Sequence, residues 1–197
     1  MTILNEKHHL RTLLRQRRQQ YHATINQRVI DFQLKERWQE LNLLYPLQPE
    51  QKIAGYYPVG SELNILSLLE YLNSLGHSLC LPVITDLAEL EFISWTPTAP
   101  LERDLLNIPS PSLSGGQRMD PDIILVPLLG FDQQGHRLGQ GKGYYDKTLY
   151  RLRKGRKIIT IGMGFGCQYL DNIVVCDKDY PMDYILTPEK IFTINKD

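Results

Sequence analysis

The residues best suited to chemistry in this chain lie close together, between positions 135 and 146. This segment holds four glycines, two tyrosines, Arg137, Lys142 and Asp146. Glycine lets backbone N–H groups come close to a bound phosphate, and the two basic side chains add full positive charges. Asp146 is a candidate ligand for a metal ion that neutralises phosphate. The segment therefore predicts a phosphate-binding site.

The glycine spacing matches neither of the two common nucleotide motifs. Gly143 follows Lys142, where the Gly-x-x-x-x-Gly-Lys-Ser/Thr loop has a hydroxyl residue. The glycines at 139, 141 and 143 are also too evenly spaced for Gly-x-Gly-x-x-Gly. The alternative is a tight turn in which glycine provides only backbone freedom. Composition alone favours phosphate binding without identifying the ligand.

A second group of basic residues lies near the start of the sequence. Lys7 and Arg11 are four positions apart, so on a helix they share one face. Their charges repel each other unless an anion lies between them. The alternative, a solvated helix face, is favoured by composition alone. Arg15, Arg17 and Arg18 add charge and obscure which residue matters.

Three carboxylates are candidates for ligand contacts. Glu62 stands at the start of a predicted helix, where the helix dipole alone favours it. It could also pair with N–H donors of a ligand, with Tyr57 as a neighbouring wall. Asp179 and Asp183 lie in a polar segment that predicts a turn. The functional alternative is that one of them joins Asp146 in holding a metal.

The elements that must position these residues follow from apolar periodicity. Helices are predicted over 6–21, 24–44, 62–75 and 147–153, and strands over 52–57, 78–83, 91–95, 122–127, 157–163, 173–175 and 184–187. The first helix is expected to face solvent, and Ser61 is expected to cap the third.

Strands that alternate with helices favour an α/β class with a mostly parallel sheet, in one domain spanning residues 1–197. Ligands bind such sheets at the carboxyl ends of the strands, where 57–62 and the glycine-rich segment both fall. The proline-rich stretch 96–121 predicts a long surface connection.

Composition excludes several classes of protein. The 22 basic and 22 acidic residues give zero formal charge, which argues against a general role on nucleic acid or membrane surfaces. No apolar run reaches the roughly 18 residues of a membrane span. Cys80, Cys167 and Cys176 lack metal-ligand spacing and predict reduced thiols in a cytoplasmic protein. Cys80 is expected to be buried.

The segments 126–132 and 135–146 together closely resemble the signature of the 5-formyltetrahydrofolate cyclo-ligase family, also called methenyltetrahydrofolate synthetases. Further matches cover nearly the whole chain, at Lys7-x-x-x-Arg11, 57–62, 81–83, 108–109 and Asp179-x-x-x-Asp183. The resemblance implies a single three-layer α/β domain, similar to ribose-phosphate isomerases and CoA transferases.

The same resemblance implies a ligase of folate one-carbon metabolism that uses ATP as co-substrate and Mg²⁺ as cofactor. Its substrate would be 5-formyltetrahydrofolate and its product 5,10-methenyltetrahydrofolate. The formyl oxygen would take the γ-phosphoryl group, and the folate N10 would then attack and close the ring. This agrees with a chain that shows no nucleophile triad. The enzyme would act on these two small molecules as a monomer.

The resemblance also assigns residues to roles. Catalysis would rest on Arg137 and Lys142, and magnesium binding on Asp146 and Asp179. The implied ATP-binding residues are Lys7, Arg11, Arg137, Leu138, Gly139, Gln140, Gly141, Lys142, Gly143, Tyr144 and Tyr145. The implied folate-binding residues are Tyr57, Glu62, Gly141, Lys142, Gly143 and Tyr144.

The chain departs from the family pattern at two places, and two other functions are compatible with parts of the sequence. Lys178 stands where many members carry histidine, and 107–111 lacks a glutamate of many bacterial members, so this loop receives no catalytic role. A phosphosugar isomerase or phosphate sensor would explain the glycine-rich segment but not Lys7, Arg11 and Asp146 together. The basic first eighteen residues suggest RNA binding, which zero net charge and the lack of interleaved aromatic residues oppose.

Overall fold

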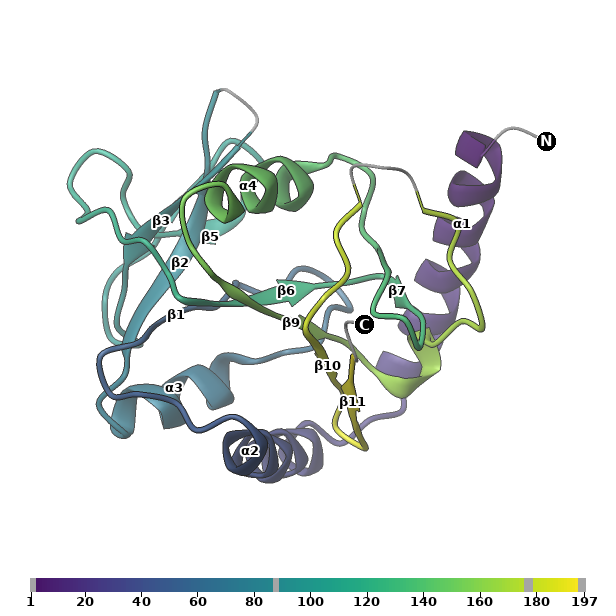
Figure 1. Cartoon of the computed structure of the whole chain (residues 1–197), viewed down its shortest axis with the longest axis horizontal. Helices are drawn as coiled ribbons and strands as arrows, with labels where there is room; N and C mark the ends of the chain where they lie inside the picture. Colours follow the sequence, from purple (N-terminus) through teal and green to yellow (C-terminus); the bar gives the residue numbers. More distant parts are fainter. Residues whose placement is uncertain (1–2, 87–88, 176–178, 195–197) are drawn as a thin grey trace.

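The computed structural model describes residues 3–86, 89–175 and 179–194, and most of its elements surround one seven-stranded sheet (Figure 1). The strands are β1 (Lys52–Ala54), β2 (Ser78–Ile84), β3 (Leu90–Ser94), β6 (Ile123–Pro127), β9 (Ile159–Met163), β10 (Tyr184–Leu186) and β11 (Ile191–Thr193). Their order is β11-β10-β9-β6-β1-β2-β3. Only the two edge strands, β11 and β3, pair antiparallel. The predicted mostly parallel α/β sheet is confirmed.

Helices cover both faces of the sheet, which gives the predicted three layers. Helices α2 (Gln27–Leu44) and α3 (Leu66–Ser74) lie on one face, and α4 (Tyr144–Arg153) lies on the other (Figure 1). The inner face of α2 carries buried residues at helical spacing, namely Ile30, Leu34, Trp38 and Leu41. Each such side chain contributes roughly 1.5–3 kcal/mol by leaving water.

The central strands are apolar on both sides because both sides are covered. In β6, Leu125 packs with the α2 and α3 layer, while Ile124 and Val126 pack on the α4 side. Successive side chains of a strand point to opposite faces, so a continuous apolar run supplies two cores at once.

Helix α1 (Ile3–His22) lies outside these layers, against the 3₁₀ turn η1 (Gly166–Gln168) and the loops that follow the strands (Figure 1). The prediction of a wholly solvent-facing helix is wrong. Lys7, Leu14 and Arg18 are buried, and of these three only Leu14 is apolar. This helix therefore docks through polar contacts as well as through apolar area.

The predicted helix over 62–75 starts too early, because α3 begins at Leu66. The Asn64 side-chain oxygen accepts from the Leu66 N–H at 3.0 Å, and Ser61 is not the cap. The Glu62 carboxylate accepts from the Val59 N–H at 3.0 Å, which closes a turn instead of starting a helix. Residues 62–65 are thereby kept as loop.

Other predicted boundaries shift by a few residues. Helix α2 begins at Gln27, after an Asn26 cap that accepts from the Arg28 N–H, and β1 ends at Ala54. Helix α4 begins at Tyr144, so it includes the end of the glycine-rich segment. The strand predicted over 173–175 does not form.

The stretch 96–121 is more than a surface connection. It contains a hairpin of β4 (Glu102–Arg103) and β5 (Pro109–Ser110). The Asp104 carboxylate accepts from the Leu106 and Ile108 N–H groups at 2.8 and 2.9 Å. Asn107 takes a left-handed φ of 62° at the tip, a conformation that asparagine tolerates well.

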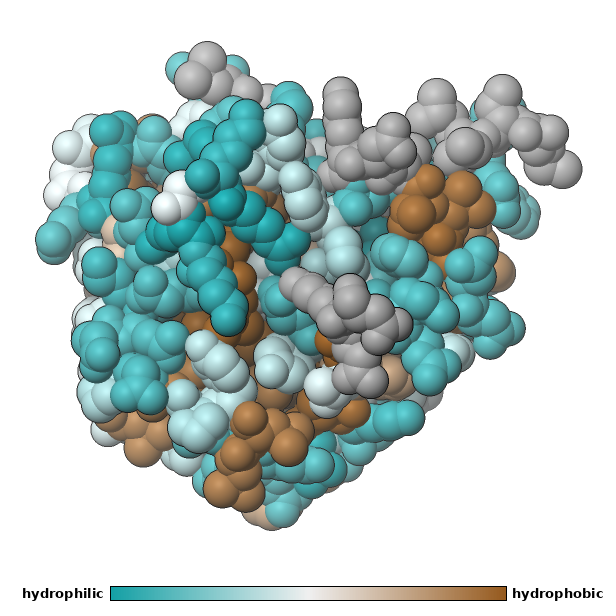
Figure 2. Space-filling view, in the orientation of Figure 1, coloured by the Kyte–Doolittle hydropathy of each residue, from teal (hydrophilic) through white to brown (hydrophobic). Residues whose placement is uncertain are grey.

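The surface fits the composition. The face drawn in Figure 2 is mainly hydrophilic, and its apolar residues form separate patches. Single exposed apolar residues are normal on soluble domains. Among the described residues, no helix combines the length and apolar character of a membrane span.

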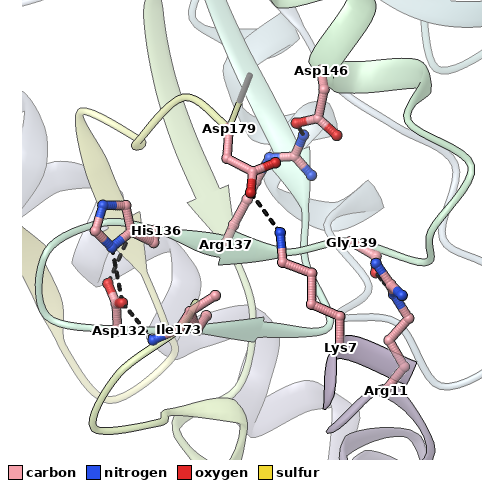
Figure 3. Close-up of polar contacts among 9 residues, drawn as sticks. All are labelled: Lys7, Arg11, Asp132, His136, Arg137, Gly139, Asp146, Ile173 and Asp179. Carbon is pink, nitrogen blue, oxygen red and sulfur yellow. Dashed lines mark hydrogen bonds and ion pairs between the residues drawn. The ribbon is translucent and has the colours of Figure 1, made fainter. Parts of the chain in front are cut away.

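A second hairpin, β7 (Gly130–Phe131) with β8 (Arg137–Leu138), separates β6 from the glycine-rich loop. Its turn is built on the fully buried Asp132. That carboxylate accepts from the N–H groups of Gln134, His136 and Ile173 at 2.9–3.0 Å and contacts His136 Nδ1 at 3.0 Å (Figure 3). The bond to Ile173 explains why 173–175 forms no strand.

Replacing Asp132 should destabilise the protein. Asp132→Ala would leave three backbone donors unsatisfied, each costing about 1–3 kcal/mol. We expect a loss of at least about 2 kcal/mol in urea unfolding, and a smaller loss for Asp132→Asn, which keeps one acceptor oxygen. Asp171→Ala, at an exposed position, is the control. Equal stability of the Asp132→Ala variant and the control would contradict this role.

Candidate functional site

A cleft of about 530 Å³ opens at the carboxyl ends of the central parallel strands. Its walls include 56–57 and 59–62 after β1, Pro82 and Ile84 at the end of β2, and 127–129 at the end of β6. Every residue to which the family resemblance assigns a role lines this cleft. The structure therefore brings these residues together at the edge of the sheet where ligands were expected, and the role and ligand assigned to each residue stay predictions.

Helix α1 forms a cationic wall. Lys7, Arg11, Arg15 and Arg18 all line the cleft, spaced four, four and three positions apart. Such spacing puts side chains on one helix face, so the expected shared face of Lys7 and Arg11 is confirmed. Arg15 and Arg18 were missed, although continuing the same spacing would have selected them. Arg17, which does not line the cleft, is excluded by that spacing.

The four cations of this wall are bonded to three other segments of the cleft (Figure 3 shows the bonds of Lys7 and Arg11). The bonds join Lys7 Nζ to Asp179 at 2.6 Å, Arg11 Nε to the Gly139 carbonyl at 3.0 Å, Arg15 Nε to the Gln140 side chain at 3.1 Å, and Arg18 Nε to the Ser61 hydroxyl at 3.1 Å. The helix thus links three loops that are remote in sequence.

The glycine-rich loop joins β8 to α4. Gly141 has a φ of 102°, and a Cβ there would lie 3.3 Å from the Arg11 guanidinium, so a larger residue is both strained and crowded. Gly143, with φ 71°, is the residue before α4. The first N–H groups of a helix lack partners within it and favour an anion. Lys142 is exposed at the rim.

Arg137 is held tightly from two sides. Its Nη2 bonds Asp146 at 2.5 Å, and its guanidinium lies over the Tyr145 ring at 5.8 Å (Figure 3 shows the ion pair). Within the described part of the chain, Arg137 Nε is buried with no hydrogen-bond partner. The neighbouring Leu138 side chain packs with Leu14 in a small apolar cluster. Arg137 is therefore placed to meet an acceptor, and Leu138 mainly to anchor the loop.

Glu62 lies in a region where charge is costly. Burial raises its pKa, and the bond from the Val59 N–H, the Arg18 charge and a hydrogen bond with Gln140 act in the opposite direction. Burial also raises the pKa of the Tyr56 and Tyr145 phenols, with Glu62 adding to both shifts. Both phenols therefore stay protonated beside the carboxylate.

The wall opposite the cations is largely apolar. It includes Ile84, Leu90, Leu106, Ile108 and Pro109. The last three belong to the β4–β5 hairpin, within the stretch predicted to be a mere connection. The family resemblance included 108–109 but assigned these residues no role, and apolar residues in a proline-rich stretch do not show where they pack. The cleft is thus charged on one side and apolar on the other.

The predicted metal ligands each have a basic partner. Asp146 pairs with Arg137 and Asp179 with Lys7. No group of three His, Cys, Asp or Glu residues that could hold a metal occurs in the described ranges. These two carboxylates fit Mg²⁺ that is bound mainly by phosphate and water oxygens, as is common for nucleotide-bound magnesium.

Other residues considered from sequence lie elsewhere. Asp183 accepts from the Thr160 N–H at 2.8 Å and joins strands, and it is not among the residues lining the cleft. Cys80 is fully buried, as predicted, and burial raises the pKa of its thiol. Cys176 and Lys178 lie outside the described residues, so the predictions about them stay open.

Comparison with known proteins gives one consistent family. The model of the "5-formyltetrahydrofolate cyclo-ligase family" matches residues 3–188. The 5-formyltetrahydrofolate cyclo-ligase of Haemophilus influenzae is 31% identical over 152 residues, covering 74% of this chain and 80% of the relative. The enzyme of Mycolicibacterium smegmatis is 34% identical over 145 residues, covering 70% and 74%.

Solved structures show the same fold. The Aquifex aeolicus 5,10-methenyltetrahydrofolate synthetase superposes with a TM-score of 0.73 at 25% identity, covering 95% of this chain and 94% of that one. The synthetase from Mycoplasma pneumoniae gives a TM-score of 0.65 at 22% identity, covering 96% and 99%, and supports the fold alone.

The partly buried Glu62 carboxylate predicts a stability that depends on pH. Because the folded state raises the pKa of Glu62 above 4.5, stability falls as pH rises through that folded pKa, and at pH 7 the ionised group is a net cost. Glu62→Gln keeps an acceptor for the Val59 N–H and removes the charge. We expect a higher melting temperature than wild type at pH 7 and little difference at pH 4, measured by circular dichroism. A lower melting temperature at pH 7 would count against a costly buried charge.

Proposed function

The chain belongs to the 5-formyltetrahydrofolate cyclo-ligase family, and from that membership we propose that it converts 5-formyltetrahydrofolate to 5,10-methenyltetrahydrofolate with ATP as second substrate and magnesium as cofactor. The observation that carries the proposal is the single cleft in which Lys7, Arg11 and the glycine-rich loop meet Tyr57 and Glu62. One set suits phosphate and the other suits a neutral ring with N–H donors.

The proposed reaction balances without a protein nucleophile. The formyl oxygen attacks the γ-phosphorus, and ADP leaves. The folate N10 then forms a bond to the activated carbon, the C–O bond breaks, and phosphate departs with that oxygen. N10 loses its proton to phosphate or water. Because the nucleophiles belong to the substrates, the protein must align them and stabilise the charge on the moving phosphoryl group.

The basic residues are suited to that charge. Arg137 is buried, has one unpaired nitrogen among the described residues, and is oriented by Asp146 and Tyr145. Lys142 stands on the loop that leads into α4 and can approach a phosphate from solvent. Lys7 and Arg11 add charge from the opposite wall. Positive groups fixed before the reaction lower its barrier more than groups that must reorganise.

Asp146 and Asp179 are the residues that would hold magnesium, which when bound neutralises phosphate charge. Both carboxylates have basic partners, Arg137 and Lys7, which are themselves suited to phosphate. In a bound magnesium–nucleotide complex, the two carboxylates would face the metal ion and the two basic side chains would face phosphate. Each of the four groups would therefore keep a partner of opposite charge.

The folate is assigned to the other side of the cleft. Its formyl-bearing ring carries N–H groups that match the Glu62 carboxylate, and its aromatic portion matches the apolar wall of Ile84, Leu106 and Ile108. Tyr57 and Tyr144 border both regions. Pairing the N–H groups of the ring with a partly buried carboxylate would favour this substrate over rings that lack such donors, because a carboxylate left without donors there is costly.

The two competing functions lose support. The family model spans the basic helix, the glycine-rich loop and the late aspartates together, which a phosphosugar isomerase or sensor would not require. The RNA-binding alternative relied on a solvated basic helix. Four of its five basic residues instead line the cleft.

A direct assay tests the proposal. Purified protein, ATP, Mg²⁺ and 5-formyltetrahydrofolate should give methenyltetrahydrofolate, followed by its ultraviolet absorbance, together with ADP and phosphate in equal amounts. Omitting ATP should abolish the product. Absence of ATP-dependent product from folded protein would refute the proposed activity.

Lys142→Ala should slow turnover by about 10²-fold, the typical effect of losing one group that stabilises transition-state charge. The effect should fall on kcat more than on the KM for folate, measured by steady-state kinetics. Lys147→Ala is the matched control, because Lys147 is exposed in α4 and does not line the cleft. If both variants kept wild-type kcat, Lys142 would be only a loop residue.

A further inference from the structure

Arg18 is a buried charge that the reaction as described does not use. It is only 5% exposed and lines the cleft. Its Nε donates to the Ser61 hydroxyl at 3.1 Å, and in the described ranges its Nη1 is buried without a hydrogen-bond partner. Burying a guanidinium is costly unless a negative charge compensates it. The position of Arg18 therefore calls for a nearby anion.

Glu62 is that anion, and it directly follows the serine that Arg18 contacts. Burial lowers the pKa of Arg18. Of the groups that raise this pKa, Glu62 has the largest effect. Arg18 in turn opposes the rise that burial causes in the pKa of Glu62. Among the described residues the two side chains make no direct ion pair, so they interact through charge and through Ser61, which Arg18 bonds and which precedes Glu62 in the chain.

The other groups around Glu62 do not replace Arg18. Tyr56 and Tyr145 are neutral phenols, and Gln140 is a neutral amide. Arg15 reaches this region through Gln140, to which its Nε donates at 3.1 Å. Arg15 is also partly exposed and disfavours the charge on Arg18. After the Val59 N–H, Arg18 is the largest influence that opposes the rise in the pKa of Glu62, and it is the buried positive charge among those influences.

We propose that Arg18 is a positioning residue of the folate site, which fixes the 57–62 loop through Ser61 and keeps the Glu62 carboxylate ionised to accept the N–H groups of the folate ring. This inference rests on the proposed function. An ionised carboxylate offers acceptors to two adjacent N–H groups, whereas a protonated one carries a donor that would oppose them. Arginine suits the task because its planar fork can bond Ser61 and still face the carboxylate.

Two variants separate charge from bulk. Arg18→Gln removes the charge and can keep the bond to Ser61, and Arg18→Lys keeps the charge. Binding of 5-formyltetrahydrofolate without nucleotide should be measured by calorimetry from pH 5 to 9. Because loss of Arg18 raises the pKa of Glu62, Arg18→Gln should begin to lose affinity at a higher pH than wild type does on acidification. At neutral pH it should bind about tenfold more weakly, and Arg18→Lys should stay close to wild type.

Controls locate the effect. Arg17→Gln, on the exposed face of the same helix, should bind folate with the wild-type pH profile. Glu62→Gln should bind weakly and remove the acid limb, because no carboxyl is left to titrate. Arg18→Gln should leave the affinity for ATP nearly unchanged, which a general collapse of α1 would not do.

The outcomes discriminate clearly. An unchanged pH profile in Arg18→Gln, or equal losses of folate and ATP affinity, overturns the inference. Should Arg18→Gln fail to fold, Arg18→Lys is compared with the uncharged variant Arg18→Met. Equal shifts of their folate-binding pH profiles from that of wild type would also overturn the inference. Failure of the wild-type protein to bind folate would sink the proposed function instead, so the two ideas fail separately.

Discussion

The docking of α1 through its basic face is the constraint on which the site depends. Lys7, Arg11, Arg15 and Arg18 each bond a segment of another wall, and each also lines the cleft. The same side chains therefore hold the walls together and present charge to a ligand. A helix docked by apolar area alone would hold the loops equally well but would leave the cleft without positive charge on this side.

Several charged side chains of the cleft lie beside a side chain of opposite charge. Lys7 with Asp179 and Arg137 with Asp146 are partly buried pairs, and a lone partner of either pair would be costly. Glu62 is the exception, since its pKa is raised by burial and it relies on the Arg18 charge at a distance. The carboxylate of Glu62 is therefore the charge of this site whose ionised form is least stabilised by a direct partner, and it lies in the part of the cleft assigned to the folate.

Sequence predicted what local periodicity determines. The inner face of α2 and the buried strands β6 and β9 follow directly from apolar spacing, and the glycine-rich loop from composition. Predictions failed where contacts with residues distant in the sequence determine the local conformation. Residues 62–65 stay non-helical in a segment bonded to Arg18, and Ile173 bonds Asp132 instead of joining a sheet. Arg15 and Arg18 were missed because charge alone does not show which face of a helix is covered.

The bond between Lys7 and Asp179 has a consequence for biosynthesis, because it joins residues 172 positions apart. Chains emerge from the ribosome in sequence order, so α1 is made long before the last segment it binds. Until residue 179 has been synthesised, this bond cannot form. Basic residues at Lys7, Arg11, Arg15 and Arg18 give the cleft-lining face of α1 little tendency to associate with other nascent chains. The side of the cleft formed by Lys7 and Asp179 can be completed only after nearly the whole chain has been synthesised.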